Sequence, residues 1–230
     1  MKNIKLLKLS KLSKLSKLLL VTLSILSIFS FSAIAVYGND IRVNPRDDIQ
    51  AAIDKANRGD TVYLSAGVYH TDVAINIANK EGITISSQGG EVSIICSDVY
   101  EEVFFIENST SINIIGIGAA HHIEEEAGCA ASVINISNSS DISIEGCDLH
   151  GCGICGINID NSSEITITEC FIHHNSWAAI SIYSSGDIYI QYNEITNNHQ
   201  SFSLYEVNGS VEIMGNIVYD NYEGANLENN

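Results

Sequence analysis

Apolar and polar residues alternate in short triplets along the second half of the chain, and these triplets recur at a constant interval. The clearest are Ile142-Ser-Ile144, Ile165-Thr-Ile167, Ile188-Tyr-Ile190 and Val211-Glu-Ile213. Three residues after each triplet stands a member of a second series, spaced by 23 residues: Cys147, Cys170, Asn193 and Asn216. Such a triplet is typical of a short strand with one buried face. A period of this length indicates stacked repeats that bury their apolar faces against one another.

Each repeat is predicted to contain three short strands. The four clear repeats cover residues 133–155, 156–178, 179–201 and 202–224. The first strand leads into a polar turn, the triplet forms the second strand, and the third strand carries one apolar residue, namely Leu149, Ile172, Ile195 or Ile217. No helical pattern separates the strands, and parallel crossovers are almost always right-handed. We therefore expect an all-β fold, a single-stranded right-handed parallel β-helix with coils of about 23 residues.

The chain before these repeats is expected to hold the N-terminal cap and longer coils. Residues 48–56 read as a short amphipathic helix that caps the coil stack, with Asp47 or Asp48 near its N-terminus. We assign residues 36–72 to the cap and first coil, and residues 73–230 to the β-helix. Wider spacing between the early repeats predicts insertions near residues 89–102 and 118–131.

The last coil is predicted to be uncapped. Residues 225–228 begin another copy of the first strand, and the sequence gives no capping element after it. Because an open parallel edge favours aggregation, we expect either that another subunit covers this coil or that the chain is part of a longer β-helix. Self-association through the last coil is one of these two expectations.

The residues 23 apart at the corner after the second strand are interpreted as a structural ladder. Asn is favoured there because it tolerates left-handed backbone angles and its amide can bond the neighbouring coils. Cys147 and Cys170 take the same position in two earlier coils. They are expected either to pair as a disulfide between adjacent coils or to pack as buried thiols, and both roles are structural.

Residues 1–35 are interpreted as a secretory signal peptide. Six lysines precede an apolar stretch that ends at Ala33-Ile34-Ala35, a small-x-small cleavage signal. Removing this segment would leave all 28 acidic residues and only five basic ones, a net charge of about −23. We expect an exported protein, in the periplasm, at the cell surface or outside the cell. Such a charge repels nucleic acid and attracts cations, and after cleavage no stretch remains that could span a membrane.

Histidines, cysteines and carboxylates concentrate near the turn after the third strand. The residues that could hold a metal there are His121, His122, Glu124, Cys129, His150, Cys152, Cys155, His173 and His174. Imidazole, thiolate and carboxylate together suit zinc or copper, so either is a candidate cofactor. Alternatively, Cys152 and Cys155 form disulfides with each other or with Cys129, and the histidines are ordinary polar turn residues.

A family resemblance enters at residues 49–69. The segment Ile49-Gln-Ala-Ala-Ile-Asp-Lys-Ala-Asn-Arg-Gly-Asp-Thr-Val-Tyr-Leu-Ser-Ala-Gly-Val-Tyr69 resembles the cap and first coil of the pectin-lyase-like superfamily. The later repeats resemble those of NosD-type periplasmic proteins. The resemblance implies the fold, whereas members differ in function and include polysaccharide lyases, epimerases, adhesins and copper-delivery accessory proteins. The arginines all lie in the cap, and the motifs of polygalacturonases and of epimerases are missing.

The outward face of the first strands is the candidate surface for sugar. The family resemblance implies a groove on this face, and its candidate binding residues are Asn135, Asn158, Asp160, Trp177, Ser181, Tyr183 and Tyr205. The aromatic rings could stack on sugars while the amides and the carboxylate bond hydroxyls. Alternatively, these residues simply suit an exposed strand face.

The favoured function is binding or scaffolding at the cell envelope, with a polysaccharide or glycoconjugate as partner or in an adhesin-like role. Two alternatives remain open. One is a metal-binding accessory protein of NosD type, and the other is a lyase- or epimerase-like enzyme that acts on the first-strand face. The missing enzyme motifs favour binding over catalysis, and no catalytic residue is assigned.

Overall fold

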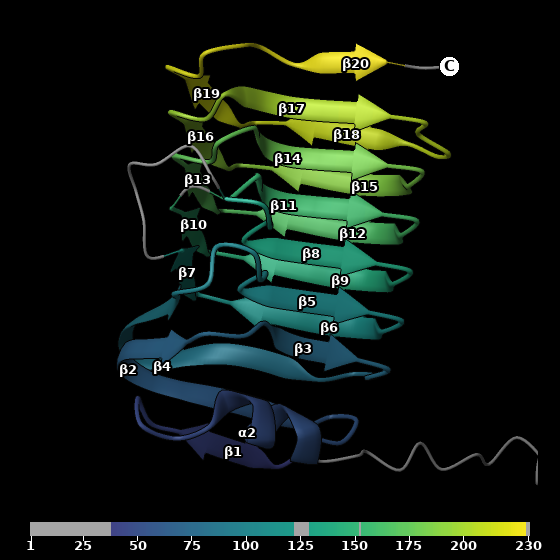
Figure 1. The fold of residues 1–230 in the computed structure, drawn as a ribbon. Coiled ribbons are helices and arrows are strands. Elements are labelled where there is room, and N and C mark those ends of the chain that lie inside the picture. The colour runs from purple at the N-terminus through teal and green to yellow at the C-terminus, as the bar shows by residue number, and fades with distance from the viewer. Residues whose placement is uncertain (1–37, 122–128, 152, 229–230) are drawn as a thin grey trace, which may run out of the picture. The chain divides into compact units, whose positions relative to one another are not determined.

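The computed structural model describes residues 38–121, 129–151 and 153–228. Within them the chain winds through successive coils whose strands stack in parallel (Figure 1). The first strands of the coils form a seven-stranded sheet that contains β3 (Ile75–Ala78), β5 (Phe104–Glu107), β8 (Ile134–Ser137), β11 (Cys155–Asp160), β14 (Ala178–Tyr183), β17 (Gln200–Tyr205) and β20 (Asn226–Glu228). The parallel β-helix predicted from the repeats is therefore confirmed.

The second and third strands of the coils belong to one thirteen-stranded sheet. Its second strands are β6 (Thr110–Ile115), β9 (Ser140–Glu145), β12 (Ser163–Thr168), β15 (Gly186–Gln191) and β18 (Val211–Met214). Its third strands are β7 (Gly118–His121), β10 (Asp148–His150), β13 (Phe171–His173), β16 (Glu194–Thr196) and β19 (Ile217–Tyr219). The sheet also contains β1 (Asp40–Val43), β2 (Thr61–Thr71) and β4 (Thr84–Cys96).

Strand β4 joins the two series because it is long enough to pass the corner at which later coils turn. Its first residues pair with β6 and its last four pair with β7. Residues 89–96 do not loop out as predicted, because they are strand, but β4 holds two extra residues relative to β2 between Gln88 and Val92. The second predicted insertion also begins later than expected, because residues 118–121 form β7.

The core is a column of isoleucines repeated from coil to coil. In the first strands Ile134, Ile157, Ile180 and Phe202 pair in register, and in the second strands Ile142, Ile165, Ile188 and Val211 do the same. In the third strands the register aligns Ile195 with Val218, so Val218 and not Ile217 continues the series. The period of 23 residues also leads from Ile195 to Val218, so the prediction of Ile217 as the apolar residue of this strand is wrong by one position.

Helix α2 (Ile49–Lys55) lies at the first-coil end of the stack (Figure 1). It begins as predicted, because the Asp48 side chain accepts a hydrogen bond from the amide of Ala51 at 3.0 Å. The side chain of Gln50 then bonds the backbone of β3 as a neighbouring strand would. Its side-chain oxygen accepts from the Asn76 amide at 2.7 Å, and its side-chain nitrogen donates to the Asn76 carbonyl at 3.0 Å. The helix thereby satisfies backbone groups at the edge of the seven-stranded sheet.

Three side-chain ladders hold the three corners of the coils. The predicted ladder is present: Cys147 and Cys170 are free buried thiols, and the Asn193 amide donates to the side-chain oxygen of Asn216 at 2.9 Å. The left-handed backbone angle, however, belongs to the preceding residue, for example Tyr192 at φ 58°. Two further ladders follow the first and third strands, and consist of Ser109, Ser139, Ser162 and Ser185, and of Asn175, Asn198 and Asn221.

The coil formed by β18 and β19 is the most exposed part of the stack. Large apolar side chains there are accessible to solvent, namely Ile213, Met214, Ile217, Val218 and Tyr219. Self-association through this surface stays a prediction. Within the described part of the chain, no helix has the length and apolar character needed to cross a membrane. The predicted signal peptide lies outside the described residues.

Candidate functional site

A cleft of about 550 Å³ lies on the outward face of the seven-stranded sheet. Every residue that the sequence proposed for this face lines it: Asn135, Asn158, Asp160, Trp177, Ser181, Tyr183 and Tyr205. The strand register places them in two columns, because Asn158 pairs with Asn135 and Ser181, and Asp160 pairs with Tyr183. The structure also adds Phe105 and Asn226 to the lining, which the repeat would have indicated if it had been extended by one coil at each end.

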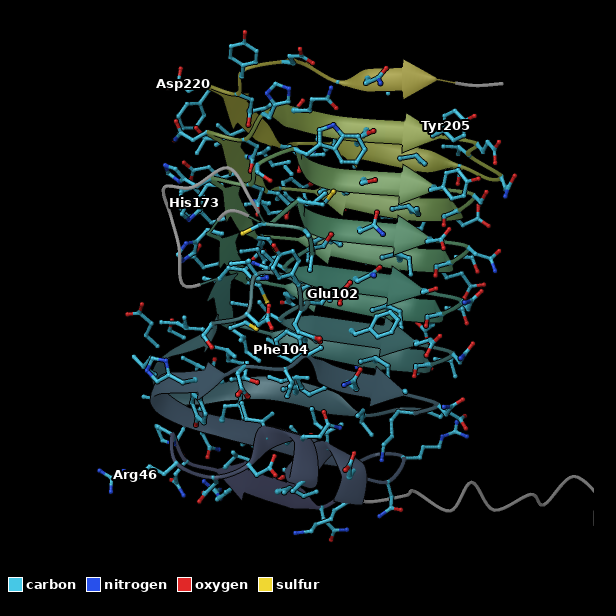
Figure 2. The ribbon with its side chains drawn as sticks, viewed as in Figure 1. Arg46, Glu102, Phe104, His173, Tyr205 and Asp220 are labelled. Atoms are coloured by element: carbon cyan, nitrogen blue, oxygen red, sulfur yellow. The ribbon has the colours of Figure 1, made fainter. Side chains whose placement is uncertain are left out.

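Tyr183 and Tyr205 form the aromatic part of the cleft. Their rings are parallel, with an interplanar angle of 6° and centroids 5.5 Å apart. They stack because they occupy equivalent positions on adjacent strands β14 and β17. Tyr205 lies at the edge of the stack opposite to His173 (Figure 2). Tyr183 is 43% exposed, and Trp177, on the turn after β13, is 40% exposed, so both can contact a ligand.

A chain of side-chain hydrogen bonds fixes the amides of the cleft. Asn135 donates through its amide nitrogen to a carboxylate oxygen of Glu102 at 3.1 Å. Asn158 donates in turn to the side-chain oxygen of Asn135, also at 3.1 Å. Because Glu102 accepts only, the chain has one direction, and the amide oxygen of Asn158 is left to accept from a ligand. Glu102 was missed in the sequence because it precedes the strand and belongs to an early coil of different length.

Acidic groups surround the tyrosines. Hydrogen bonding to the Glu206 carboxylate raises the pKa of Tyr183 above its ordinary value, so its hydroxyl is protonated and serves as a donor at neutral pH. Asp160 is the one carboxylate among the described residues that line the cleft, and these residues include no lysine, arginine or histidine. The site therefore offers hydrogen-bonding groups and aromatic faces with a negative charge.

Cys155 lies beneath the cleft at the start of β11. Its thiol is buried, and burial raises its pKa to about 11 despite hydrogen bonds to Ser132 and Ser181. A thiol with such a pKa is almost entirely protonated at neutral pH and is a poor metal ligand or nucleophile. Cys129 is disulfide-bonded, while Cys155 is free, so the prediction that Cys155 forms a disulfide is wrong.

The structure does not gather the residues proposed for a metal into one set. His122, Glu124 and Cys152 lie outside the described residues. His121 is buried at the end of β7, its Nε2 lies 2.9 Å from the Glu101 carbonyl oxygen, and burial lowers its pKa. His150, His173 and His174 do lie together on the outer face of β10 and β13, and Asp148 joins them. Asp148 was missed although it lies two residues before His150 and thus on the same face of the strand.

The comparisons with known proteins agree with this architecture. A family model described as "right handed beta helix region" matches residues 102–230. The chain therefore belongs to the right-handed β-helix family. The hand of the helix and the fold are as predicted, whereas the NosD subtype stays a prediction. A search of the curated proteins gives no match.

Three solved structures that share the fold are named as lyases. Pectate lyase Pel9A is 15% identical with a TM-score of 0.64, and the alignment covers 79% of this chain and 55% of the lyase. A rhamnogalacturonan lyase is 11% identical with a TM-score of 0.53, covering 82% and 63%. An alginate lyase from Paenibacillus is 15% identical with a TM-score of 0.50, covering 77% and 75%. The chain thus spans about half the length of the pectate lyase.

Proposed function

We propose that the protein binds a polysaccharide or glycoconjugate in the cleft of the first-strand sheet. The observation that carries the proposal is the combination of an exposed aromatic face at Tyr183 with the directed amide chain that ends at Asn158, in one cleft of about 550 Å³. Sugar rings present apolar C–H faces and hydroxyl edges, and this cleft offers a partner for each. The solved structures named as lyases support a saccharide as the class of ligand.

The charges of the cleft favour a neutral glycan over a polyuronate. Asp160 lies in the cleft, and Glu102 and Glu206 flank it through hydrogen bonds to its residues. An anionic chain would approach these carboxylates without a cationic partner among the described lining residues. The same observation favours binding over lyase-like or epimerase-like catalysis, because uronate chemistry requires neutralisation of the sugar carboxylate. An adhesin-like role at the cell envelope is compatible with such binding.

Affinity electrophoresis of the tag-free protein tests the proposal. Galactomannan and mixed-linkage β-glucan serve as neutral probes, and polygalacturonate serves as the anionic comparison. We expect a neutral polymer to retard the protein and polygalacturonate to leave its mobility unchanged. Tyr183→Ala should weaken binding about two- to tenfold, the effect of one lost aromatic contact. Tyr189→Ala is the matched control, because Tyr189 is a similarly exposed tyrosine on β15, outside the cleft.

Two results would overturn the proposal. One is that neither neutral polymer retards the protein. The other is that Tyr189→Ala weakens retardation as much as Tyr183→Ala, since the cleft would then have no special part in binding. Release of reducing ends from the retarding polymer would instead show a glycan-cleaving enzyme, and would favour the enzyme alternative over simple binding.

A further inference from the structure

The outer face of the third strands holds a second cluster, on a different sheet from the cleft. Strands β10 and β13 are adjacent and parallel, with Asp148 paired to Phe171 and Leu149 paired to Ile172. Leu149 and Ile172 point into the core and are buried. Alternation along each strand therefore turns Asp148, His150 and His173 outward, on a backbone that the ladders hold in place. Figure 2 shows His173 at the edge of the stack.

The three side chains converge on one point. The rings of His150 and His173 stack at 11° with centroids 4.7 Å apart, and His173 Nε2 lies 2.9 Å from Asp148 Oδ1. One ligand atom from each residue lies within 4.8 Å of the other two. The His173 side chain is 13% exposed and that of Asp148 is 51% exposed, so an ion can reach the cluster from solvent.

We propose that Asp148, His150 and His173 bind one divalent transition-metal ion of the zinc type. Two imidazoles and a carboxylate are a ligand set that suits Zn²⁺, whereas Ca²⁺ and Mg²⁺ prefer oxygen ligands alone. Three protein ligands leave a fourth position of the tetrahedral ion for water or for a ligand group from a partner. The excess of 28 acidic over 11 basic residues adds a negative field that attracts the cation.

His174 is placed to orient the His173 ring. Its Nδ1 lies 2.6 Å from His173 Nδ1. One of the two Nδ1 atoms donates to the other, so His174 fixes the orientation of the His173 ring. A metal ion held by His173 Nε2 would leave His173 Nδ1 to donate to His174. Such a second partner is the usual support of a metal-bound histidine.

Neighbouring residues offer matched controls. Glu194 pairs with Phe171 on the next strand and continues the outward column of Asp148, but its carboxylate accepts a hydrogen bond from the Tyr219 hydroxyl at 2.7 Å. His70 is an exposed histidine on β2. Glu194→Gln therefore removes a carboxylate, and His70→Ala removes an imidazole, while Asp148, His150 and His173 all stay in place.

Calorimetric titration of the tag-free, metal-stripped protein with ZnCl₂ tests the proposal. We expect about one tight Zn²⁺ per chain, a much weaker response to CaCl₂, and retention of the site in Glu194→Gln and His70→Ala. The double variant His150→Ala/His173→Ala should lose it. His174→Ala should weaken Zn²⁺ binding about ten- to a hundredfold, the effect of losing the hydrogen-bond partner that orients a metal-bound histidine.

A separate measurement guards against a double variant that fails to fold. Addition of ZnCl₂ to the ¹⁵N-labelled wild-type protein should shift the imidazole nitrogen signals of His150 and His173 and leave those of His70 in place. The proposal is overturned if wild-type protein takes up no stoichiometric Zn²⁺, or if the folded double variant binds it as tightly as wild type. Asp148, His150 and His173 would then form a structural hydrogen-bond network only. The cleft is not involved in either result, so glycan binding is tested independently.

Discussion

The thiol of Cys170 lies 3.6 Å from the carbonyl oxygen of Ile144. One coil later, Asn193 donates from its side-chain amide to the carbonyl of Ile167 at 3.0 Å, and it does so from the equivalent position. Cysteine therefore takes the place of asparagine in the ladder, with a weaker donor aimed at the same backbone acceptor. Cys147 and Cys170 therefore have a structural role in the ladder.

Replacement of Cys170 by Asn should preserve or increase stability. The amide of Cys170→Asn would donate to Ile144 with the geometry of the next coil, and a net hydrogen bond contributes about 1 kcal/mol. Cys170→Ala should instead lower the free energy of unfolding by about 1–2 kcal/mol, because it leaves a small cavity and an unsatisfied acceptor. Urea denaturation followed by circular dichroism measures both. A Cys170→Asn protein less stable than Cys170→Ala would show that the corner has no room for the amide.

Gly156 should be far less tolerant of substitution than Gly146. A Cβ at Gly156 would lie 2.4 Å from Ile172 Cγ2 and 2.8 Å from the Ala179 carbonyl oxygen. Gly156→Ala should therefore cost about 1–3 kcal/mol or more through overpacking between coils. Gly146 has φ of 60° with no atom within 4 Å of its Cβ position. Gly146→Ala meets only the left-handed backbone cost of about 1–2 kcal/mol, which Glu169 and Tyr192 already bear at equivalent corners.

The thermal midpoints of the two variants provide the comparison. We expect the larger drop for Gly156→Ala, together with weaker glycan retardation, because β11 carries both this glycine and Asn158 of the cleft. Equal drops would contradict the close packing between adjacent coils at this position.

The raised pKa of Cys155 predicts a thiol that resists alkylation in the folded protein. With a pKa of about 11, roughly one thiol in a thousand is ionised at pH 8, and burial blocks access as well. Iodoacetamide treatment followed by peptide mass spectrometry should find Cys155 unmodified in native protein and modified in urea. Rapid native labelling would instead reveal an accessible, reactive cysteine under the cleft.

Asp60 should contribute to stability at neutral pH and lose that contribution in acid. Its carboxylate accepts hydrogen bonds from the backbone amides of Asn39 at 2.7 Å and Asn57 at 2.9 Å, and these bonds lower its pKa. Because the folded pKa is below the unfolded value of about 3.9, the contribution is complete above that value and disappears as pH falls through the folded pKa.

The acid response of Asp60→Asn tests this linkage. The variant should be less stable than wild type at pH 6, and the difference should shrink at pH 3. Urea midpoints at both pH values measure the effect, with the exposed Asp72→Asn as control. A constant difference between wild type and Asp60→Asn would show that Asp60 acts without its charge.

The coils could be predicted because the period of 23 residues identifies equivalent positions in successive coils. Once one strand is divided into inward and outward residues, the same division applies to its equivalents. The same alternation placed Asn158, Asp160 and Tyr183 on one face, and they do line one cleft. It failed where the period changes. Residues 89–96, expected to loop out, are strand because β4 continues through them with a register shift against β2.

The histidine cluster was only half predicted for a similar reason. Residue types near one turn suggested a metal site of thiols and imidazoles, but neighbouring positions along a strand face opposite sides. Cys155 is buried at the start of β11, in the other sheet, while His150 on β10 and His173 on β13 are directed outward. Asp148 completes that outward group, and it is found by following the alternation of β10 rather than by counting ligand types.

The last prediction concerns Glu102, which contacts the cleft only through Asn135. Its carboxylate accepts from the Asn135 amide and so fixes the direction of the whole amide chain.

Glu102→Gln supplies a donor as well as an acceptor, which allows the Asn135 and Asn158 amides to rotate and present the wrong group to a sugar hydroxyl. We expect about a two- to tenfold weaker retardation by the neutral polymer that binds, at unchanged thermal stability, since one hydrogen bond is worth about 0.5–1.5 kcal/mol. Glu145→Gln is the matched control, because Glu145 is an exposed carboxylate on β9 and does not line the cleft. Unchanged retardation in Glu102→Gln would mean that the amides of the cleft take their orientation from the ligand.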